Sequence, residues 1–301
     1  MRLYRTYVKI RSGYKPAFNE RRIFERKPHS DREVNARGFR DREHADEKPK
    51  DVYRVVVLGD SVTDGYAVNF DDRYAIRLEA LLNRGGRKYE VISLALNQYS
   101  TVQEVELLKE VGLGLSPDLV IVAYVLNDPC PDGSIVRFFR QEGATSLALH
   151  WITAELKRAL IKPQAPERLP GCRSFDYYSE LHCDSAMWAE VQGALTEVHD
   201  LSRKHDFRVL LVVFPVLAKE PDASFSDYLW RSVHAQVLEE AGRQQFDTLD
   251  LLPSFAVRRP VDLKREAGDQ LHPNALGNEI AASAIYGKLL DLGIATNGAD
   301  R

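Results

Sequence analysis

Short runs of apolar, mostly β-branched residues recur along the chain from residue 53 onward, and longer segments separate them. The runs have the length and composition of strands that are buried on both faces of a parallel sheet. They predict strands at residues 53–58, 89–94, 119–125 and 208–214, and a weaker one at 248–251.

In the segments between these runs, apolar residues return every three or four positions, which is the spacing of an amphipathic helix. The pattern predicts helices at 73–83, 102–111, 187–205, 228–244 and 275–290. Thr101 is the expected cap of the second helix and Asn274 that of the last. Because strands alternate with helices, the predicted fold is α/β: a three-layer α/β/α sandwich with a central five-stranded parallel sheet.

The first fifty residues show no clear helical or strand period. They carry 15 Lys and Arg against 8 Asp and Glu, whereas the rest of the chain carries 26 against 36. We interpret residues 1–50 as a basic arm or small subdomain, which either lies over the acidic α/β domain of residues 51–295 or contacts an anionic lipid or polymer.

Residues 129–185 interrupt the alternation after the third predicted strand. They contain a helical stretch at 145–161 and the proline-rich sequence KPQAPERLPG. Ligands of open α/β sheets bind beyond the carboxyl ends of the strands, so this insert is a candidate lid or pocket wall. A decorative insertion or an oligomer contact explains it equally well, and a homodimer formed through the arm also stays open.

The composition, 44% hydrophobic and 28% charged, is that of an ordinary globular protein. The near-balance of 41 basic and 44 acidic residues argues against a nucleic-acid partner. No apolar run approaches the ~18 residues of a membrane span. The charged start lacks the apolar region of a signal peptide, from which we expect a cytoplasmic protein.

The three cysteines, Cys130, Cys172 and Cys183, form no CxxC pair. The sequence therefore indicates neither a disulfide framework nor a zinc site. The simplest interpretation is three thiols in a reducing compartment, although a bridge between Cys172 and Cys183 is not excluded.

The first predicted strand runs directly into a serine. The sequence VVVLGDSVTDG, residues 55–65, places Ser61 at the carboxyl end of that strand, where backbone N–H groups converge. A serine hydroxyl is a weak nucleophile unless a base removes its proton, so the proposal requires a histidine and a carboxylate from elsewhere in the chain.

Among the eight histidines, His272 has the context of such a base. It follows Asp269 by three residues in the sequence DQLHP, so Asp269 can accept the Nδ1 proton and leave Nε2 facing Ser61. The other histidines lie in polar or helical contexts and are interpreted as surface residues. They are His29, His44, His150, His182, His199, His205 and His234.

Three motifs together resemble the SGNH/GDSL hydrolases: the GDS of residues 59–61, the pair Asn127 and Asp128, and the DxxHP of residues 269–273. The resemblance runs in order and spacing from about residue 53 to 290. The sequence NARGFRD, residues 35–41, also looks like a segment that precedes the GDS strand in some bacterial members, and the resemblance assigns it no role.

The resemblance implies a flavodoxin-like SGNH fold with Ser61 as nucleophile, His272 as base and Asp269 beside it. It also implies an oxyanion hole built from the Ser61 amide, a glycine amide and the side chain of Asn127. An amide N–H aimed at the developing negative charge stabilises that charge without titrating. We expect no cofactor and no metal.

The chain departs from the family pattern at the glycine. Gln98 occupies its expected position in the loop after the second strand, and Val125 replaces a glycine commonly found two residues before the asparagine. The Gln98 backbone N–H can still donate, provided that the residue tolerates the φ that glycine permits. The loss of one donor would cost on the order of 10²–10³ in rate.

Asp60 and Asp64 allow a second interpretation, as metal ligands, because carboxylates after a first strand also occur in phosphohydrolases. The aspartyl-phosphate pattern needs a second Asp where Val62 stands, so structural hydrogen bonding is the favoured role. Asp128 is expected to cap or brace the turn after the third strand.

Three hypotheses for the function follow. The first is a serine ester hydrolase that forms an acyl-enzyme on Ser61 and acts on a small-molecule or carbohydrate ester, for example by deacetylating a sugar or natural product. The second is an acyltransferase with the same triad, in which the insert binds an acceptor or excludes water. The third is a binding protein in which the altered loop at Gln98 has lost activity.

Overall fold

The computed structural model describes residues 14–16, 24–26, 31, 33–66, 68–129, 167–218 and 224–296. At its centre, five parallel strands form one sheet in the order β4-β3-β5-β6-β7. The strands are β3 (Val52–Gly59), β4 (Lys88–Ala95), β5 (Leu119–Tyr124), β6 (Arg208–Val213) and β7 (Asp247–Asp250). All five predicted strands are confirmed, and their ends agree with the prediction to within one residue.

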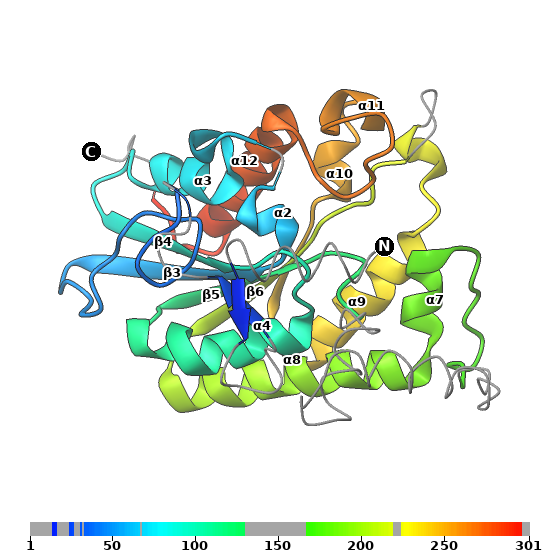
Figure 1. Ribbon diagram of the computed structural model, residues 1–301, viewed down its shortest axis with the longest axis horizontal. Helices are drawn as coiled ribbons and strands as arrows, with labels where there is room; N and C mark the ends of the chain where they lie inside the picture. Colours follow the sequence, from blue (N-terminus) through cyan, green and yellow to red (C-terminus); the bar gives the residue numbers. More distant parts are fainter. Residues whose placement is uncertain are drawn as a thin grey trace.

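Helices cover both faces of the sheet, as predicted. The five predicted helices correspond to α3 (Tyr74–Leu82), α4 (Thr101–Leu107), α8 (Ser185–His205), α9 (Arg231–Arg243) and α12 (Ala275–Asp291). Figure 1 shows α3 and α12 on one face, and α4, α8 and α9 on the other. The other described helical segments are α2 (Ser61–Asp64), α7 (Tyr177–Cys183), α10 (Leu252–Phe255), α11 (Pro260–Leu263), η1 (Phe70–Asp72), η2 (Leu108–Gly112), η3 (Leu113–Leu115) and η4 (Phe225–Asp227).

Several helix ends differ from the prediction, most of them by one or two residues, and the larger differences concern α4 and α9. Ser100, not Thr101, caps α4 through a capping box with Gln103, and the helix passes into a π-helical turn at Leu108–Gly112. The helix predicted from residue 228 begins at Arg231, because Tyr228 is extended after η4 and a turn at residues 229–230 precedes the helix. Hydrophobic spacing does not mark these boundaries, because 3₁₀, α and π turns place apolar residues at similar intervals.

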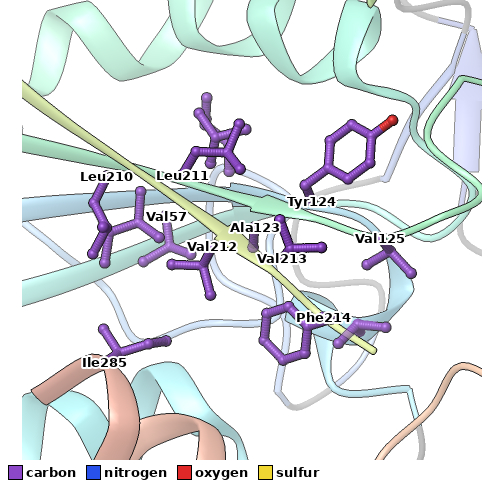
Figure 2. Packing of buried hydrophobic residues seen from close by; sticks show 14 of the residues in the cluster. Val57, Ala123, Tyr124, Val125, Leu210, Leu211, Val212, Val213, Phe214 and Ile285 are labelled. Atoms are coloured by element: carbon purple, nitrogen blue, oxygen red, sulfur yellow. The ribbon is translucent and has the colours of Figure 1, made fainter. Parts of the chain in front are cut away.

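The sheet core explains why the strands are continuously apolar. β5 is buried along its whole length. In Figure 2, Leu210 and Val212 of β6 point toward Ile285 of α12, whereas Leu211 points away from that helix. Because helices cover both faces, residues on either side of the sheet are removed from water. The burial of each large aliphatic side chain contributes about 1.5–3 kcal/mol to the stability of the fold.

A disulfide joins Cys172 to Cys183 in the last part of the insert. The expectation of three free thiols is therefore wrong for these two residues. An antiparallel bridge between Arg168 and Asp184 lies beside the disulfide. Tertiary structure brings the two cysteines together across a loop, and their spacing alone carries no such signal. The predicted helix at 145–161 lies outside the described residues.

The described part of the basic arm contacts the α/β body. β1 (Tyr14–Pro16) and β2 (Phe24–Arg26) form an antiparallel pair. The Lys48 ammonium lies 2.8 Å from the carboxylate of Asp118, next to the start of β5.

Among the described residues, no helix is both long and apolar enough to cross a membrane.

Candidate active site

Ser61 stands at the junction of β3 and α2. The strand ends at Gly59, and the Asp60 side chain caps the short helix by accepting a hydrogen bond from the Val62 N–H at 2.8 Å. Ser61 is therefore the first helical residue, with its hydroxyl at the carboxyl edge of the sheet. The first N–H groups of a helix have no partner within the helix, so the local structure presents donors beside the hydroxyl.

The structure brings Ser61, His272 and Asp269 into one hydrogen-bonded chain. His272 Nε2 lies 2.9 Å from Ser61 Oγ. On its other side, His272 Nδ1 lies 2.9 Å and 3.0 Å from the two carboxylate oxygens of Asp269. The carboxylate accepts the Nδ1 proton, which leaves the Nε2 lone pair free to accept the hydroxyl proton.

Asp269 is held in its ionised form. Burial opposes its ionisation, but hydrogen bonds from the His272 ring and from the backbone N–H groups of Leu271 and His272 outweigh burial and lower its pKa to about 2. The two backbone bonds are each 3.0 Å long and end on the same carboxylate oxygen. An imidazolium formed on His272 would therefore face a fixed negative charge.

Backbone hydrogen bonds fasten the loop that carries this pair. The Arg265 N–H donates to the His272 carbonyl at 3.2 Å, and the Leu217 N–H donates to the Gln270 carbonyl at 2.7 Å. Such bonds fix the ring of His272 relative to the sheet, which an attack by Ser61 needs.

Asn127 lies at the end of the third predicted strand and faces the same edge. One N–H of its amide donates to Asp60 Oδ2 at 3.3 Å, and Ser61 Oγ lies 3.3 Å from the same oxygen, which is a more distant acceptor for the hydroxyl proton than His272 Nε2 at 2.9 Å. Asp60 thus links the predicted oxyanion donor to the predicted nucleophile. Burial raises the pKa of Asp60, although the hydrogen bond from Val62 opposes the shift.

Gln98 adopts the backbone conformation expected of the missing glycine. Its φ is +72°, in the left-handed region that residues with a side chain rarely occupy. The side chain is exposed, so it meets no steric obstacle beyond this local strain. Such a conformation costs roughly 1 kcal/mol or more in a residue other than glycine, and it persists only where the surroundings impose it.

Three buried carboxyl groups lie beside the predicted oxyanion side chain. Asp128 Oδ2 accepts from the Thr101 hydroxyl and from the Val125 N–H, both at 3.3 Å, so Asp128 braces the turn after β5 as expected. Burial raises the pKa values of Glu104 and Asp128 well above their ordinary range, and the nearby Asp60 carboxyl adds to both shifts. Burial therefore disfavours negative charge on Glu104 and Asp128.

The structure places two residues at the site that the sequence did not single out. The ring of Tyr66 lies 5.0 Å from the ring of His272, and about half of Tyr66 is exposed. The Arg265 guanidinium lies over the Tyr66 ring, 5.0 Å from its centroid. Tyr66 closely follows the GDS motif and could have been found as an aromatic residue at the mouth of the site, whereas Arg265 has no sequence signal.

Among the described histidines that were interpreted as surface residues, His182 and His234 are buried and the His44 side chain is only 7% exposed, so that interpretation is wrong for them, while His29 and His150 lie outside the described residues. His182 accepts or donates a hydrogen bond with Tyr124 at 2.9 Å. His234 does have a carboxylate partner, since its Nδ1 lies 2.8 Å from Asp250, and its Nε2 lies 2.8 Å from the Tyr228 hydroxyl. Their partners come from distant parts of the chain, which explains why local context did not reveal them.

A parallel α/β/α sandwich with a Ser–His–Asp arrangement at the carboxyl edge of its sheet has the architecture of a serine hydrolase. Residues 57–280 match the GDSL-like lipase/acylhydrolase family, and the chain belongs to this family. It is therefore an ester-hydrolysing enzyme. The resemblance stated from the three sequence motifs is confirmed. No curated protein sequence matches the chain.

Several solved structures share the fold at low sequence identity. TesA is 14% identical with a TM-score of 0.50, and the match covers 79% of this chain and 99% of TesA. LAE5, an alpha/beta hydrolase enzyme from the metagenome of Lake Arreo, is 16% identical with a TM-score of 0.51, over 81% and 97% of the two chains. A catalytic mutant of Axe2, an acetylxylan esterase from Geobacillus stearothermophilus, is 14% identical with a TM-score of 0.50, over 79% and 94%. These likenesses show the fold.

Proposed function

We propose that the protein is a serine esterase that works through an acyl-enzyme on Ser61. The observation that carries this proposal is the chain of contacts from Ser61 Oγ to His272 Nε2, at 2.9 Å, and from His272 Nδ1 to Asp269, at 2.9 Å. His272 removes the hydroxyl proton while Ser61 attacks the ester carbonyl. The proton then passes to the leaving alcohol, and a water activated by His272 releases the acid.

The oxyanion of the tetrahedral intermediate forms beside Ser61, Gln98 and Asn127. The Ser61 and Gln98 backbone N–H groups and the second N–H of the Asn127 amide are the proposed donors. The positive φ of Gln98 supports its inclusion, because the residue holds a glycine-like conformation despite the strain. Asp60 supports the role of Asn127 by accepting its other N–H at 3.3 Å.

The proposed substrate is an ester of a small molecule or a carbohydrate. The half-exposed ring of Tyr66 lies beside His272, and the Arg265 guanidinium lies 5.0 Å from the centroid of that ring, so an aromatic side chain and a hydrogen-bond donor stand together next to the triad, which suits a polar ester. A solved neighbour is described as an acetylxylan esterase, which makes acetyl esters of sugars the first substrates to test.

The described end of the insert supports a role as a pocket wall. The Trp230 indole N–H donates to Asp176 at 2.9 Å, and Tyr178 of α7 packs edge-on against the Trp230 ring. Burial raises the pKa of Tyr178 to about 12, and the charges of Asp176 and Asp269 add to the shift. The influence of the Asp269 charge on Tyr178 supports the proposal that α7 forms part of the pocket wall.

The test combines active-site labelling with an ester panel. A fluorophosphonate should label the wild-type protein and a Ser283→Ala control, whose exposed serine lies on α12. Ser61→Ala should abolish both labelling and the hydrolysis of p-nitrophenyl acetate. Full turnover by Ser61→Ala would refute the proposal. A product that appears only when an alcohol acceptor is added would instead favour the acyltransferase, and absent labelling with absent turnover would favour the binding protein.

A further inference from the structure

The segment of residues 33–41, which contains NARGFRD, folds as a tight turn whose own residues hold it together. The Asn35 Oδ1 accepts hydrogen bonds from the backbone N–H groups of Arg37 and Phe39, each at 3.0 Å. Gly38 has a φ of +84°, and a Cβ there would lie 2.3 Å from the Arg26 carbonyl oxygen. Both the asparagine and the glycine are therefore required by the backbone of this turn.

The turn is fixed to the body of the enzyme on two sides. Phe39 is buried in the main hydrophobic core. Asp41 accepts a hydrogen bond from the Ser93 N–H of β4 at 2.7 Å. The fully buried Arg73 donates to the Arg40 carbonyl and, at 3.0 Å, to the Ser93 hydroxyl. These contacts place the Arg40 side chain at one position relative to the sheet.

From this position the Arg40 guanidinium reaches the segment that follows Ser61. It donates to the backbone carbonyls of Asp64 at 3.3 Å, of Gly65, and of Val68 at 2.9 Å. Glu33 accepts from Arg40 Nε at 2.7 Å and fixes the plane of the guanidinium. Because the last carbonyls of a helix have no partner within it, a cation at this end satisfies them and interacts favourably with the helix dipole.

The carbonyls that Arg40 holds belong to the part of the chain that orients the candidate nucleophile. α2 is one turn long, so its geometry depends on contacts at both ends. The Tyr66 N–H donates to the Ser61 carbonyl at 3.0 Å, and the Tyr66 ring packs beside His272. A shift of this segment would therefore move Ser61 and the ring beside its base together.

We propose that Arg40 is a positioning residue for Ser61: by holding the carbonyls at the end of α2, it keeps the serine hydroxyl in line with His272. The NARGFRD segment is then a structural part of the active site, and Arg40 acts without touching the substrate. This inference rests on the proposed esterase function. It also predicts that the loss of Arg40 lowers kcat per active Ser61 and leaves KM nearly unchanged.

The test compares Arg40→Ala, Arg40→Lys and Arg37→Ala in the full chain. Arg37 lies in the same turn and pairs with the exposed Asp46, so its substitution removes the same charge without contact to α2. The measured quantities are kcat and KM for p-nitrophenyl acetate, the concentration of reactive Ser61 from fluorophosphonate titration, and the Tm. Dividing kcat by the titrated sites removes the effect of partial unfolding.

We expect Arg40→Ala to lower kcat per titrated site about 10- to 100-fold with little change in KM, because small misplacements of a nucleophile have effects of this size. Arg40→Lys should fall between it and the wild type, and low millimolar methylguanidinium should restore part of the Arg40→Ala rate. Arg37→Ala should stay within about twofold of the wild type.

A kcat per titrated site within twofold of Arg37→Ala, with a lowered Tm, would show a role in folding alone and overturn the proposal. If Arg40→Ala does not fold, Arg40→Lys decides, since it keeps the charge and the aliphatic stem while it cannot reach three carbonyls in the same plane. Absence of turnover in both the wild type and Arg37→Ala would instead refute the esterase function.

Discussion

Replacing Asp269 with asparagine tests the role of the carboxylate while it preserves the size of the side chain. The native carboxylate accepts from three N–H groups: the His272 Nδ1–H, which lies within 3.0 Å of both carboxylate oxygens, and the backbone N–H groups of Leu271 and His272. An asparagine can keep the backbone bonds through Oδ1, but its NH₂ group then faces Nδ1. His272 would have to accept at Nδ1 and carry its proton on Nε2, where it could no longer accept the proton of Ser61.

The expected loss has a kinetic part and a thermodynamic part. The wrong tautomer and the missing negative charge should lower kcat by about 10³–10⁴-fold, as a similar change does in other serine hydrolases. The pKa of Asp269 is about 2 in the folded protein against an ordinary 3.8. A shift of this size corresponds to about 2 kcal/mol of stability, which the asparagine variant lacks.

The sign of the pH dependence follows from the lowered pKa. Because the folded-state pKa lies below the unfolded value, Asp269 contributes its full stabilisation above about pH 5 and loses it as the pH falls through about 2. The wild type should therefore exceed Asp269→Asn in unfolding free energy at pH 7, and the difference should shrink in acid.

The assay is p-nitrophenyl acetate hydrolysis at pH 7 per titrated Ser61, together with urea unfolding at pH 7 and in acid. Asp262→Asn is the control, because the exposed Asp262 carboxylate of α11 pairs with Arg259, the residue that precedes this helix, and not with a residue of the triad. A kcat for Asp269→Asn within tenfold of that control would refute the proposed role of the carboxylate. A stability difference that grows in acid would refute the electrostatic argument.

Three further outcomes are expected. Asn127→Ala should lower kcat about 10²- to 10³-fold with KM nearly unchanged, since it removes one oxyanion donor. A rise in KM with an unchanged kcat would contradict this. Gln98→Gly should retain or raise kcat, because it keeps the backbone N–H. It should also raise the Tm slightly, because it relieves the strain of a φ of +72°, although glycine increases the entropy of the unfolded state. A loss of activity would mean that the Gln98 side chain is needed. Cys172→Ser together with Cys183→Ser should lower the unfolding free energy by up to about 3 kcal/mol, measured by urea unfolding, and an unchanged value under oxidising conditions would argue against the bridge.

Local patterns along the chain predicted the sheet well. Five apolar runs became the five parallel strands, because strands covered on both faces must be apolar throughout. The Asn274 cap was also predicted correctly, since its side chain accepts from the Leu276 and Gly277 N–H groups of α12. Capping is decided within three residues of the chain, and such signals can be found without a structure.

The sequence by itself determined the parallel α/β sandwich and the family, and it named Ser61, Asn127, Asp269 and His272 as one set, because each stands in a short motif next to a predicted strand or helix. Only the tertiary structure decided what lies around them. The Cys172–Cys183 bridge, the buried His234 and the Arg40 contacts to the end of α2 join residues whose sequence neighbours give no sign of the partner. Contacts of this kind depend on how distant segments pack, and hydrophobic periodicity carries no information about them.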